Sequence, residues 1–112
     1  MRKHLFVVFN YNKGIFTHIM LNVLDMNEKN YEVGIIFESE ACKFITELEN
    51  ANNEKFEKLK EKELIVAVCE VCAKAMGALE SAERQTLPIN GKLSGHPPLR
   101  DWIKLGYEVM IV

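Results

Sequence analysis

One stretch near the middle of the chain limits the possible folds more than any other. It begins with the unbroken apolar run Leu64–Val68, passes through Cys69 and Cys72, and continues in small residues as far as Gly77. Such a run is typical of a strand buried on both faces of a parallel sheet, and the residues after it change to helical spacing. We therefore predict a strand that leads directly into a helix, with the two cysteines at the turn.

The rest of the chain repeats this alternation of strand and helix. Short apolar segments predict strands at 5–9, 31–37, 63–68 and 107–112, and residues 86–89 are either a further short strand or an ordered loop. Apolar residues at helical spacing, with helix-starting residues such as Ser39 before them, predict helices at 15–25, 39–48, 49–63, 69–80 and 94–105. Alternating units of this kind form a mostly parallel sheet. We predict an α/β fold, a three-layer α/β/α sandwich with four to five strands.

Length and composition predict one domain, residues 1–112, that works in the cytoplasm without binding membranes or nucleic acids. The net charge of −2 and the pI near 5.9 give no basic surface for nucleic acid. The apolar runs are far shorter than the roughly 18 residues that a membrane span needs. Residues 1–13 offer no cleavage site of a signal peptide, and three cysteines are a poor basis for a secreted disulfide framework.

The carboxyl ends of the predicted strands are the expected location of a site, because ligands of parallel α/β sheets bind at that edge. The segments there are 10–12, Glu38-Ser39 and the two cysteines. We expect the following residues to line a pocket beside Cys69 and Cys72: Asn10, Tyr11, Asn12 and Ser39.

The position of the cysteines also predicts how they react. A thiol at the start of a helix faces the positive end of the helix dipole, which lowers its pKa and favours the thiolate. Glu70 acts in the opposite direction, because a nearby carboxylate raises a thiol pKa. We take Cys69 as the leading nucleophile, with Cys72 one turn later to assist it or to resolve its product. The third cysteine, Cys42, is expected to be a small buried or half-buried side chain.

Several other kinds of site lack the residues they need. The chain has no glycine-rich phosphate-binding motif and no Gly-x-Ser-x-Gly, so we expect no cofactor. A structural zinc site needs four ligands, whereas Cys69 and Cys72 supply two and His96 has no second histidine beside it. A thioredoxin-like protein carries its Cys-x-x-Cys after a single βα unit, whereas this pair follows the third predicted strand.

At this stretch the chain resembles the DsrE/DsrF-like family, which includes subunits of bacterial sulfur-relay complexes. The family has an apolar strand that ends in cysteine and a small-residue helix that reaches glycine eight positions later, as Cys69 and Gly77 do here. Residues 95–99 and 105–109 are similar to its last helix and strand, whereas Met76 stands where the family often has arginine. The resemblance implies a compact α/β/α sandwich, assembly as a homotrimer or hexamer, and a cysteine that accepts persulfide sulfur.

Three functional hypotheses follow. In the first, the protein carries sulfur between donor and acceptor proteins as a persulfide on Cys69, with Cys72 in support. In the second, it is a non-catalytic oligomeric module that binds a ligand or protein and keeps its cysteines for packing. In the third, it is a redox protein that uses Cys69 and Cys72 as a reversible disulfide.

Overall fold

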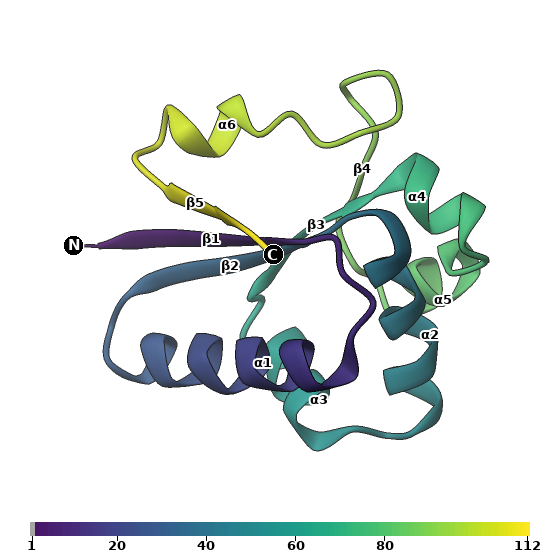
Figure 1. Ribbon diagram of the computed structural model, residues 1–112, viewed down its shortest axis with the longest axis horizontal. Coiled ribbons are helices and arrows are strands. Elements are labelled where there is room, and N and C mark those ends of the chain that lie inside the picture. The colour runs from purple at the N-terminus through teal and green to yellow at the C-terminus, as the bar shows by residue number, and fades with distance from the viewer. Residues whose placement is uncertain (1) are drawn as a thin grey trace.

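The computed structural model describes residues 2–112 and contains a five-stranded sheet with helices on both faces (Figure 1). The strand order is β4-β3-β2-β1-β5, and every pairing is parallel. The strands are β1 (Lys3–Val8), β2 (Glu32–Phe37), β3 (Ile65–Cys69), β4 (Ile89–Asn90) and β5 (Glu108–Ile111). The predicted α/β sandwich is confirmed, and the uncertain segment 86–89 leads into a very short edge strand.

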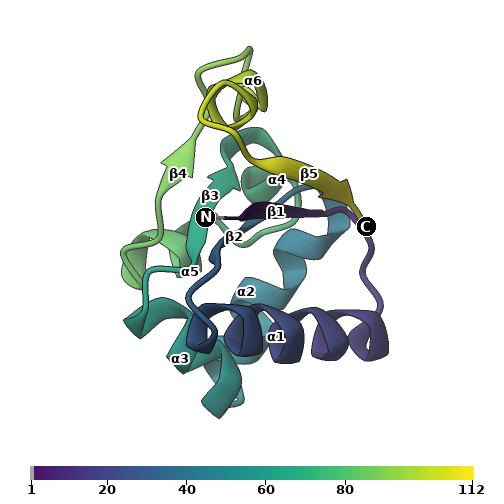
Figure 2. The ribbon, with the colours of Figure 1, turned by 90° about the vertical axis from the view of Figure 1, so that its left-hand side faces the viewer.

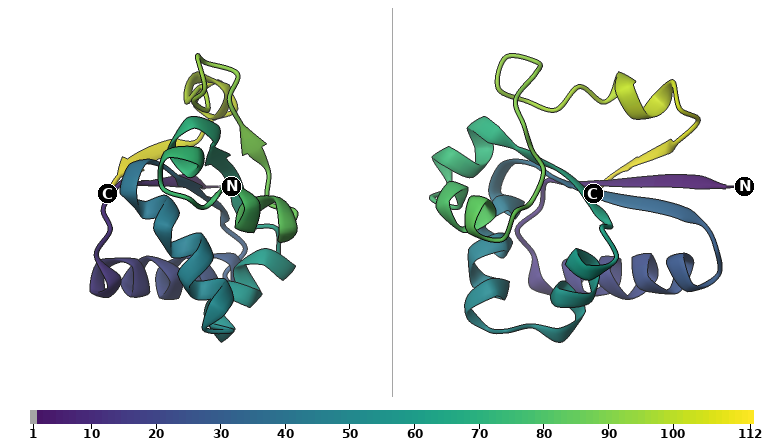
Figure 3. Two further views of the ribbon diagram at one scale, coloured as in Figure 1. Left: turned by 90° about the vertical axis from the view of Figure 1, so that its right-hand side faces the viewer. Right: turned by 180° about the vertical axis from the view of Figure 1, so that it is seen from behind.

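The helices divide unequally between the two faces of the sheet. They are α1 (Lys13–Glu28), α2 (Lys43–Asn50), α3 (Glu54–Glu61), α4 (Glu70–Ala75), α5 (Leu79–Arg84) and α6 (Arg100–Ile103), with a 3₁₀ turn η1 (Ser39–Cys42) before α2. Seen end-on and from behind, α1 and α3 lie below the sheet, whereas α6 lies above it (Figure 2, Figure 3). Within residues 2–112, no helix is both long enough and apolar enough to cross a membrane.

The buried side chains form two clusters of very different size. The larger one packs β1, β2 and β3 against α1 to α5, and Phe16, Phe37 and Phe56 are among its fully buried members. The smaller one consists of Leu5, Val7, Ile36 and Ala67, and residues from the α6 region, including Trp102, cover it. Because successive side chains of a strand point to opposite faces, β1, β2 and β3 each contribute to both clusters. One face of the sheet is therefore thickly covered and the other thinly.

Two asparagines cap the N-termini of α1 and α3, two of the helices on the thick face. The side chain of Asn12 accepts a hydrogen bond from Ile15 N at 2.9 Å, and Asn53 accepts one from Phe56 N at 2.9 Å. Both bonds satisfy an amide group that a helix start otherwise leaves without a partner. The charged segment 49–63 contains α3, which Phe56 and the fully buried Leu59 anchor in the core.

Three local predictions are wrong, each for a backbone reason. Ser39 has a φ of 50° and does not cap a helix; the cap position belongs to Glu38, without a side-chain bond. The helix expected over 69–80 is split in two, because Gly77 with a φ of 69° ends α4. The helix expected over 94–105 begins only at Arg100, since the residue before a proline avoids helical geometry and Pro97 precedes Pro98.

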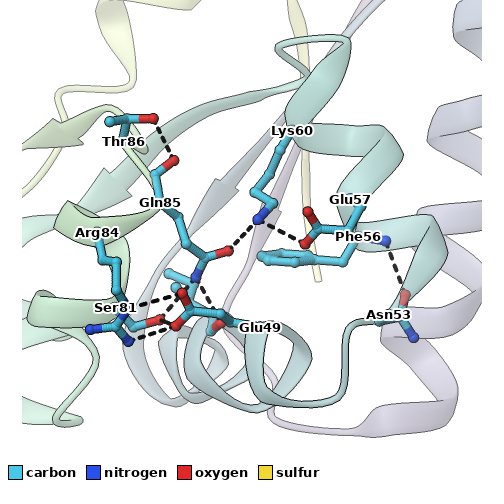
Figure 4. A network of polar contacts seen from close by, with 10 residues as sticks. Glu49, Asn53, Phe56, Glu57, Lys60, Ser81, Arg84, Gln85 and Thr86 are labelled. Carbon is cyan, nitrogen blue, oxygen red and sulfur yellow. Dashed lines mark hydrogen bonds and ion pairs between the residues drawn. The ribbon is translucent and has the colours of Figure 1, made fainter.

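A polar network ties α2, α3 and α5 together (Figure 4). Arg84 donates from Nε to Glu49 Oε2 at 3.0 Å and from its terminal nitrogen to Oε1 at 2.7 Å, and Ser81 donates to Oε1 at 2.7 Å. Gln85 bonds to Ser81 and accepts from Lys60 at 2.6 Å. The Arg84 guanidinium and the Ser81 hydroxyl together lower the pKa of Glu49 to about 2.

This lowered pKa predicts an acid-dependent loss of stability. The carboxyl of Glu49 titrates near pH 4.5 when unpaired and near pH 2 in the fold. The contribution of Glu49 to the free energy of unfolding is therefore complete above about pH 4.5 and is lost as the pH falls towards 2. In that range only the unfolded chain takes up the proton. Between pH 4.5 and pH 2, the free energy of unfolding should decrease less in the variant Glu49→Gln than in the wild type. Urea titrations at several pH values measure this difference.

The matched control is Glu61→Gln, which removes an exposed carboxylate from α3. It should keep the wild-type dependence on pH. The same pH dependence in Glu49→Gln and in the wild type would contradict the role assigned to this ion pair.

Candidate functional site

Four chemically active side chains meet at the carboxyl edge of the sheet. Cys69 is the last residue of β3, and Cys72 lies in the first turn of α4. Glu38 directly follows β2, and His96 lies in the loop between β4 and α6. One donor atom from each of the four lies within 4.8 Å of the others. Segments far apart in the sequence thus build a single cluster.

The shortest distances in this cluster join the two sulfur atoms and the imidazole ring. Cys69 Sγ lies 3.0 Å from Cys72 Sγ and 3.1 Å from His96 Nδ1. Glu38 Oε1 lies 3.6 Å from Cys72 Sγ and 3.7 Å from His96 Nδ1. All three cysteines of the chain are free thiols.

A tight turn holds His96 in place. Leu93 and His96 bond to each other in both directions, at 2.8 and 2.9 Å, around Ser94 with a φ of 49° and Gly95 with a φ of 95°. Two successive positive φ values are the mark of a type I′ turn. Gly95 O also accepts a bond from Val71 N at 3.0 Å, and a Cβ on Gly95 would lie 3.0 Å from Val71 Cβ. This close contact fixes the loop on the start of α4.

Burial governs the acidity of the cysteine at the strand end. The side chain of Cys69 has no exposed surface, and this burial is the main reason that its pKa is raised. The hydrogen bond with Cys72 and the carboxylate of Glu38 act in the same direction. The shift is opposite to the helix-dipole effect that the sequence suggested, and α4 has only six residues. The carboxylate that affects the thiol is Glu38 rather than Glu70.

The third cysteine lies beneath the cluster. Cys42 is fully buried, as predicted, and burial raises its pKa to about 12. Its thiol is therefore protonated and shielded at neutral pH, which makes it a useful internal control for the reactivity of the other two.

The cluster does not have the geometry of a catalytic triad. In a triad, the histidine contacts the nucleophile with one ring nitrogen and the carboxylate with the other. Here the same atom, His96 Nδ1, faces both Cys69 and Glu38. Proton relay from cysteine to carboxylate across the imidazole ring is therefore not what this arrangement provides.

A shallow hollow beside the cluster gives access to one of the two thiols. Cys72 is half-buried and lines the hollow, whereas Cys69 lies behind it. The other residues that line the hollow are mainly apolar: Phe9, Glu38, Ser39, Leu93, His96, Pro97 and Leu99. The accessible thiol at this edge of the sheet is thus Cys72.

Four residues were predicted to line a pocket with the cysteines, and one of them, Ser39, lines the hollow together with Cys72. The other three have structural contacts: Asn12 caps α1, and Asn10 N donates to Val112 O at 3.2 Å. The hydroxyl of Tyr11 donates to Glu47, and its ring packs against Phe44 with centroids 4.9 Å apart.

The sequence placed Glu38 at this edge without giving it a role, and it indicated His96 only as an isolated histidine. Glu38 had a detectable signal, because a carboxylate directly after a buried strand falls at the edge where sites form. His96 is brought in by a tertiary contact of the 91–96 loop, and its distance along the sequence gave no indication of that contact.

The difference in access predicts an order of thiol reactivity. Cys72 should react with iodoacetamide faster than Cys69 or Cys42, because alkylation needs an accessible thiolate and both other thiols are buried with raised pKa values. Timed alkylation followed by peptide mass spectrometry measures the three rates. The fast phase should disappear in Cys72→Ala and persist in Cys42→Ala. Faster labelling of Cys69 than of Cys72 would contradict the structure's account of access.

Comparisons with known proteins agree with this fold. The model of the DsrE/DsrF-like family matches residues 3–112. The uncharacterized protein MJ0733 of Methanocaldococcus jannaschii is 30% identical in an alignment 117 residues long, which covers 96% of this chain and 93% of that protein. The solved structure of BT1422, a conserved protein of unknown function from Bacteroides thetaiotaomicron, is similar to this chain with a TM-score of 0.69 and 17% sequence identity. The superposition covers 98% of this chain and 95% of the BT1422 chain. That structural likeness supports the fold alone.

Proposed function

Because the chain belongs to the DsrE/DsrF-like family, we propose that it carries sulfane sulfur as a persulfide on its paired cysteines. The observation that carries the proposal is the pair of free thiols 3.0 Å apart at the carboxyl edge of the sheet, one of which borders a hollow. Two thiols at this separation can exchange a sulfur atom without a large movement of the backbone.

The loading step is a displacement at sulfur and needs no external oxidant. The thiolate of Cys72 attacks the terminal sulfur of a donor persulfide, the sulfur–sulfur bond of the donor breaks, and the donor leaves as a thiolate. The product is a persulfide on Cys72. Glu38 Oε1, 3.6 Å from the Cys72 sulfur, can accept the proton of that thiol.

Access determines which cysteine we assign to each role. The sequence favoured Cys69 as the carrier, but Cys69 has no exposed surface, so we assign entry of sulfur to Cys72. Cys69 can then attack the terminal sulfur and hold the atom in the interior. Alternatively, it can attack the inner sulfur, which releases hydrogen sulfide and leaves a Cys69–Cys72 disulfide. The first route relays sulfur, and the second reduces it.

Intact-mass spectrometry after incubation with a low-molecular-weight persulfide, in the presence of a chelator, tests the proposal. The wild type and Cys42→Ala should each gain the mass of one sulfur atom, which a reducing agent should remove. Cys72→Ala should load far more slowly, because the buried Cys69 is the only remaining thiol of the pair. A wild type whose mass does not change contradicts the proposal and favours the non-catalytic module with packing cysteines. A loss of two hydrogen masses indicates a Cys69–Cys72 disulfide instead, which favours the redox hypothesis.

We also propose that the chain assembles with copies of itself and works in the cytoplasm, where relay thiols stay reduced. Apolar side chains on the thinly covered face support the assembly: Ile103, Leu105 and Ile111 are 57%, 59% and 60% exposed. Ile103 and Leu105 lie in and just after α6, and Ile111 lies in the edge strand β5. Large exposed apolar residues of this kind are typical of an interface.

Light scattering should therefore give a mass of several chains for the wild type, and Ile111→Lys should lower it towards that of one chain. Lys58→Ala, which changes α3 on the opposite face, is the control and should assemble as the wild type does. A wild type that has the mass of one chain at micromolar concentration would contradict this prediction.

A further inference from the structure

The donor atoms of the cluster comprise the ligand types that bind zinc in proteins. Thiolate sulfur, imidazole nitrogen and carboxylate oxygen are the usual ligands of Zn²⁺, and structural sites use four of them in a tetrahedron. The cluster offers two sulfurs, one nitrogen and one carboxylate from separate segments of the fold. The sequence had indicated two such ligands with an isolated histidine, and folding brings in the other two.

We propose that Glu38, Cys69, Cys72 and His96 form a binding site for a thiophilic divalent cation, with Zn²⁺ as the fitting ion. This site needs no sulfur-carrying activity, although it uses the same two thiols.

The spacing of the four donors is close to that of a tetrahedral zinc site. Bonds of about 2.3 Å to sulfur and about 2.0–2.2 Å to nitrogen and oxygen place tetrahedral ligand atoms about 3.4 to 3.8 Å apart. The distances from Glu38 Oε1 to Cys72 Sγ and to His96 Nδ1 are 3.6 and 3.7 Å. The Cys69 sulfur is closer, at 3.0 Å from Cys72 and 3.1 Å from His96. Moving these atoms apart by less than an ångström, through side-chain rotation, would bring all four distances to tetrahedral values, and the atoms of the two remaining pairs lie within 4.8 Å of each other.

The burial of Glu38 independently indicates a cation. Its side chain is 8% exposed, and within residues 2–112 no lysine or arginine forms an ion pair with it. Its neighbours are the Cys72 thiol at 3.6 Å and the half-exposed His96 ring at 3.7 Å. A buried carboxylate is costly unless it is paired with a charge or coordinates a metal. A divalent ion between Glu38 and the sulfurs would supply that charge.

The ligand count determines what such an ion can do. Four protein ligands fill a tetrahedral shell, so no position remains for the water that a hydrolytic zinc site requires. The ion would instead link the loop that carries His96 to β2, β3 and α4. It would also occupy the sulfur electron pairs that attack a persulfide, so the metal-bound form cannot load sulfur. This last consequence rests on the proposed function, whereas the binding itself does not.

Titration of the reduced, chelator-stripped protein tests the site. Zn²⁺ in competition with a chromophoric chelator should bind at one ion per chain. Co²⁺ should give the intense visible bands of tetrahedral coordination together with a thiolate-to-cobalt charge-transfer band. Glu38→Gln and His96→Ala, which keep both thiols, should each weaken Zn²⁺ binding by more than the roughly 10- to 100-fold typical of an outer-shell partner.

Two control variants are matched to the ligands. His18→Ala removes the exposed histidine of α1, and Cys42→Ala removes the buried thiol outside the cluster; both should bind Zn²⁺ as the wild type does. Circular dichroism verifies that each variant is folded before titration, and Cys72→Ser takes the place of Glu38→Gln or His96→Ala if either ligand variant does not fold. Absence of the charge-transfer band, or wild-type affinity in both Glu38→Gln and His96→Ala, would overturn the four-ligand site.

The sulfur-loading experiment and the metal-binding experiment can each contradict one proposal without affecting the other. A protein that loads sulfur but binds no Zn²⁺ keeps the proposed function and loses the metal site. A protein that binds Zn²⁺ through all four ligands but takes up no sulfur keeps the site and loses the proposed function. In a protein with both properties, Zn²⁺ should prevent loading, and Glu38→Gln should need more Zn²⁺ to do so.

Discussion

The parallel pairing of β3 with β2 and β4 is the interaction on which the site depends. Val68 is aligned with Phe37 on one side and Ile89 on the other, so the three strands end at nearly the same level. This register places Glu38 beside the cysteines, and the short β4 sends the following loop back across the edge. The strand-Cys-x-x-Cys-helix stretch therefore gains its partners from its neighbours in the sheet. A slip of β3 by one residue would turn every side chain of that strand to the opposite face.

The uneven covering of the sheet determines where chemistry can occur. The larger cluster, which packs α1 to α5 on the sheet, keeps Cys42 fully buried, and Cys69 is fully buried at the end of β3. Within residues 2–112, α6 and the segments next to it cover the thin face, and the edge between the two faces remains open at Cys72. Burial raises the pKa of Cys69 and therefore lowers its intrinsic reactivity, which explains why access matters more here than the dipole of a six-residue helix. The pair combines an accessible thiol with a protected one.

Periodicity made most of the fold predictable. Alternating strand and helix patterns identified the four longer strands, the parallel sheet and the position of the cysteines at the end of β3. Two kinds of feature were not predictable. One kind is backbone conformation, such as the positive φ of Ser39, which depends on how the chain leaves β2. The other is tertiary contact, such as the bonds of Asn10 to the C-terminus and of Tyr11 to α2. The approach of His96 depends on the contact between Gly95 and Val71, which a sequence pattern does not reveal.

The central claim is that the thiol pair relays sulfur, and transfer out of the loaded protein tests it most directly. Protein that carries one added sulfur is freed of donor and mixed with an acceptor thiol, and the masses of both are followed with time. We expect the protein to lose one sulfur atom while the acceptor gains one, with both cysteines returned to free thiols. Release of hydrogen sulfide with formation of a Cys69–Cys72 disulfide, and no gain by the acceptor, would contradict a relay and make the pair a dithiol reductant.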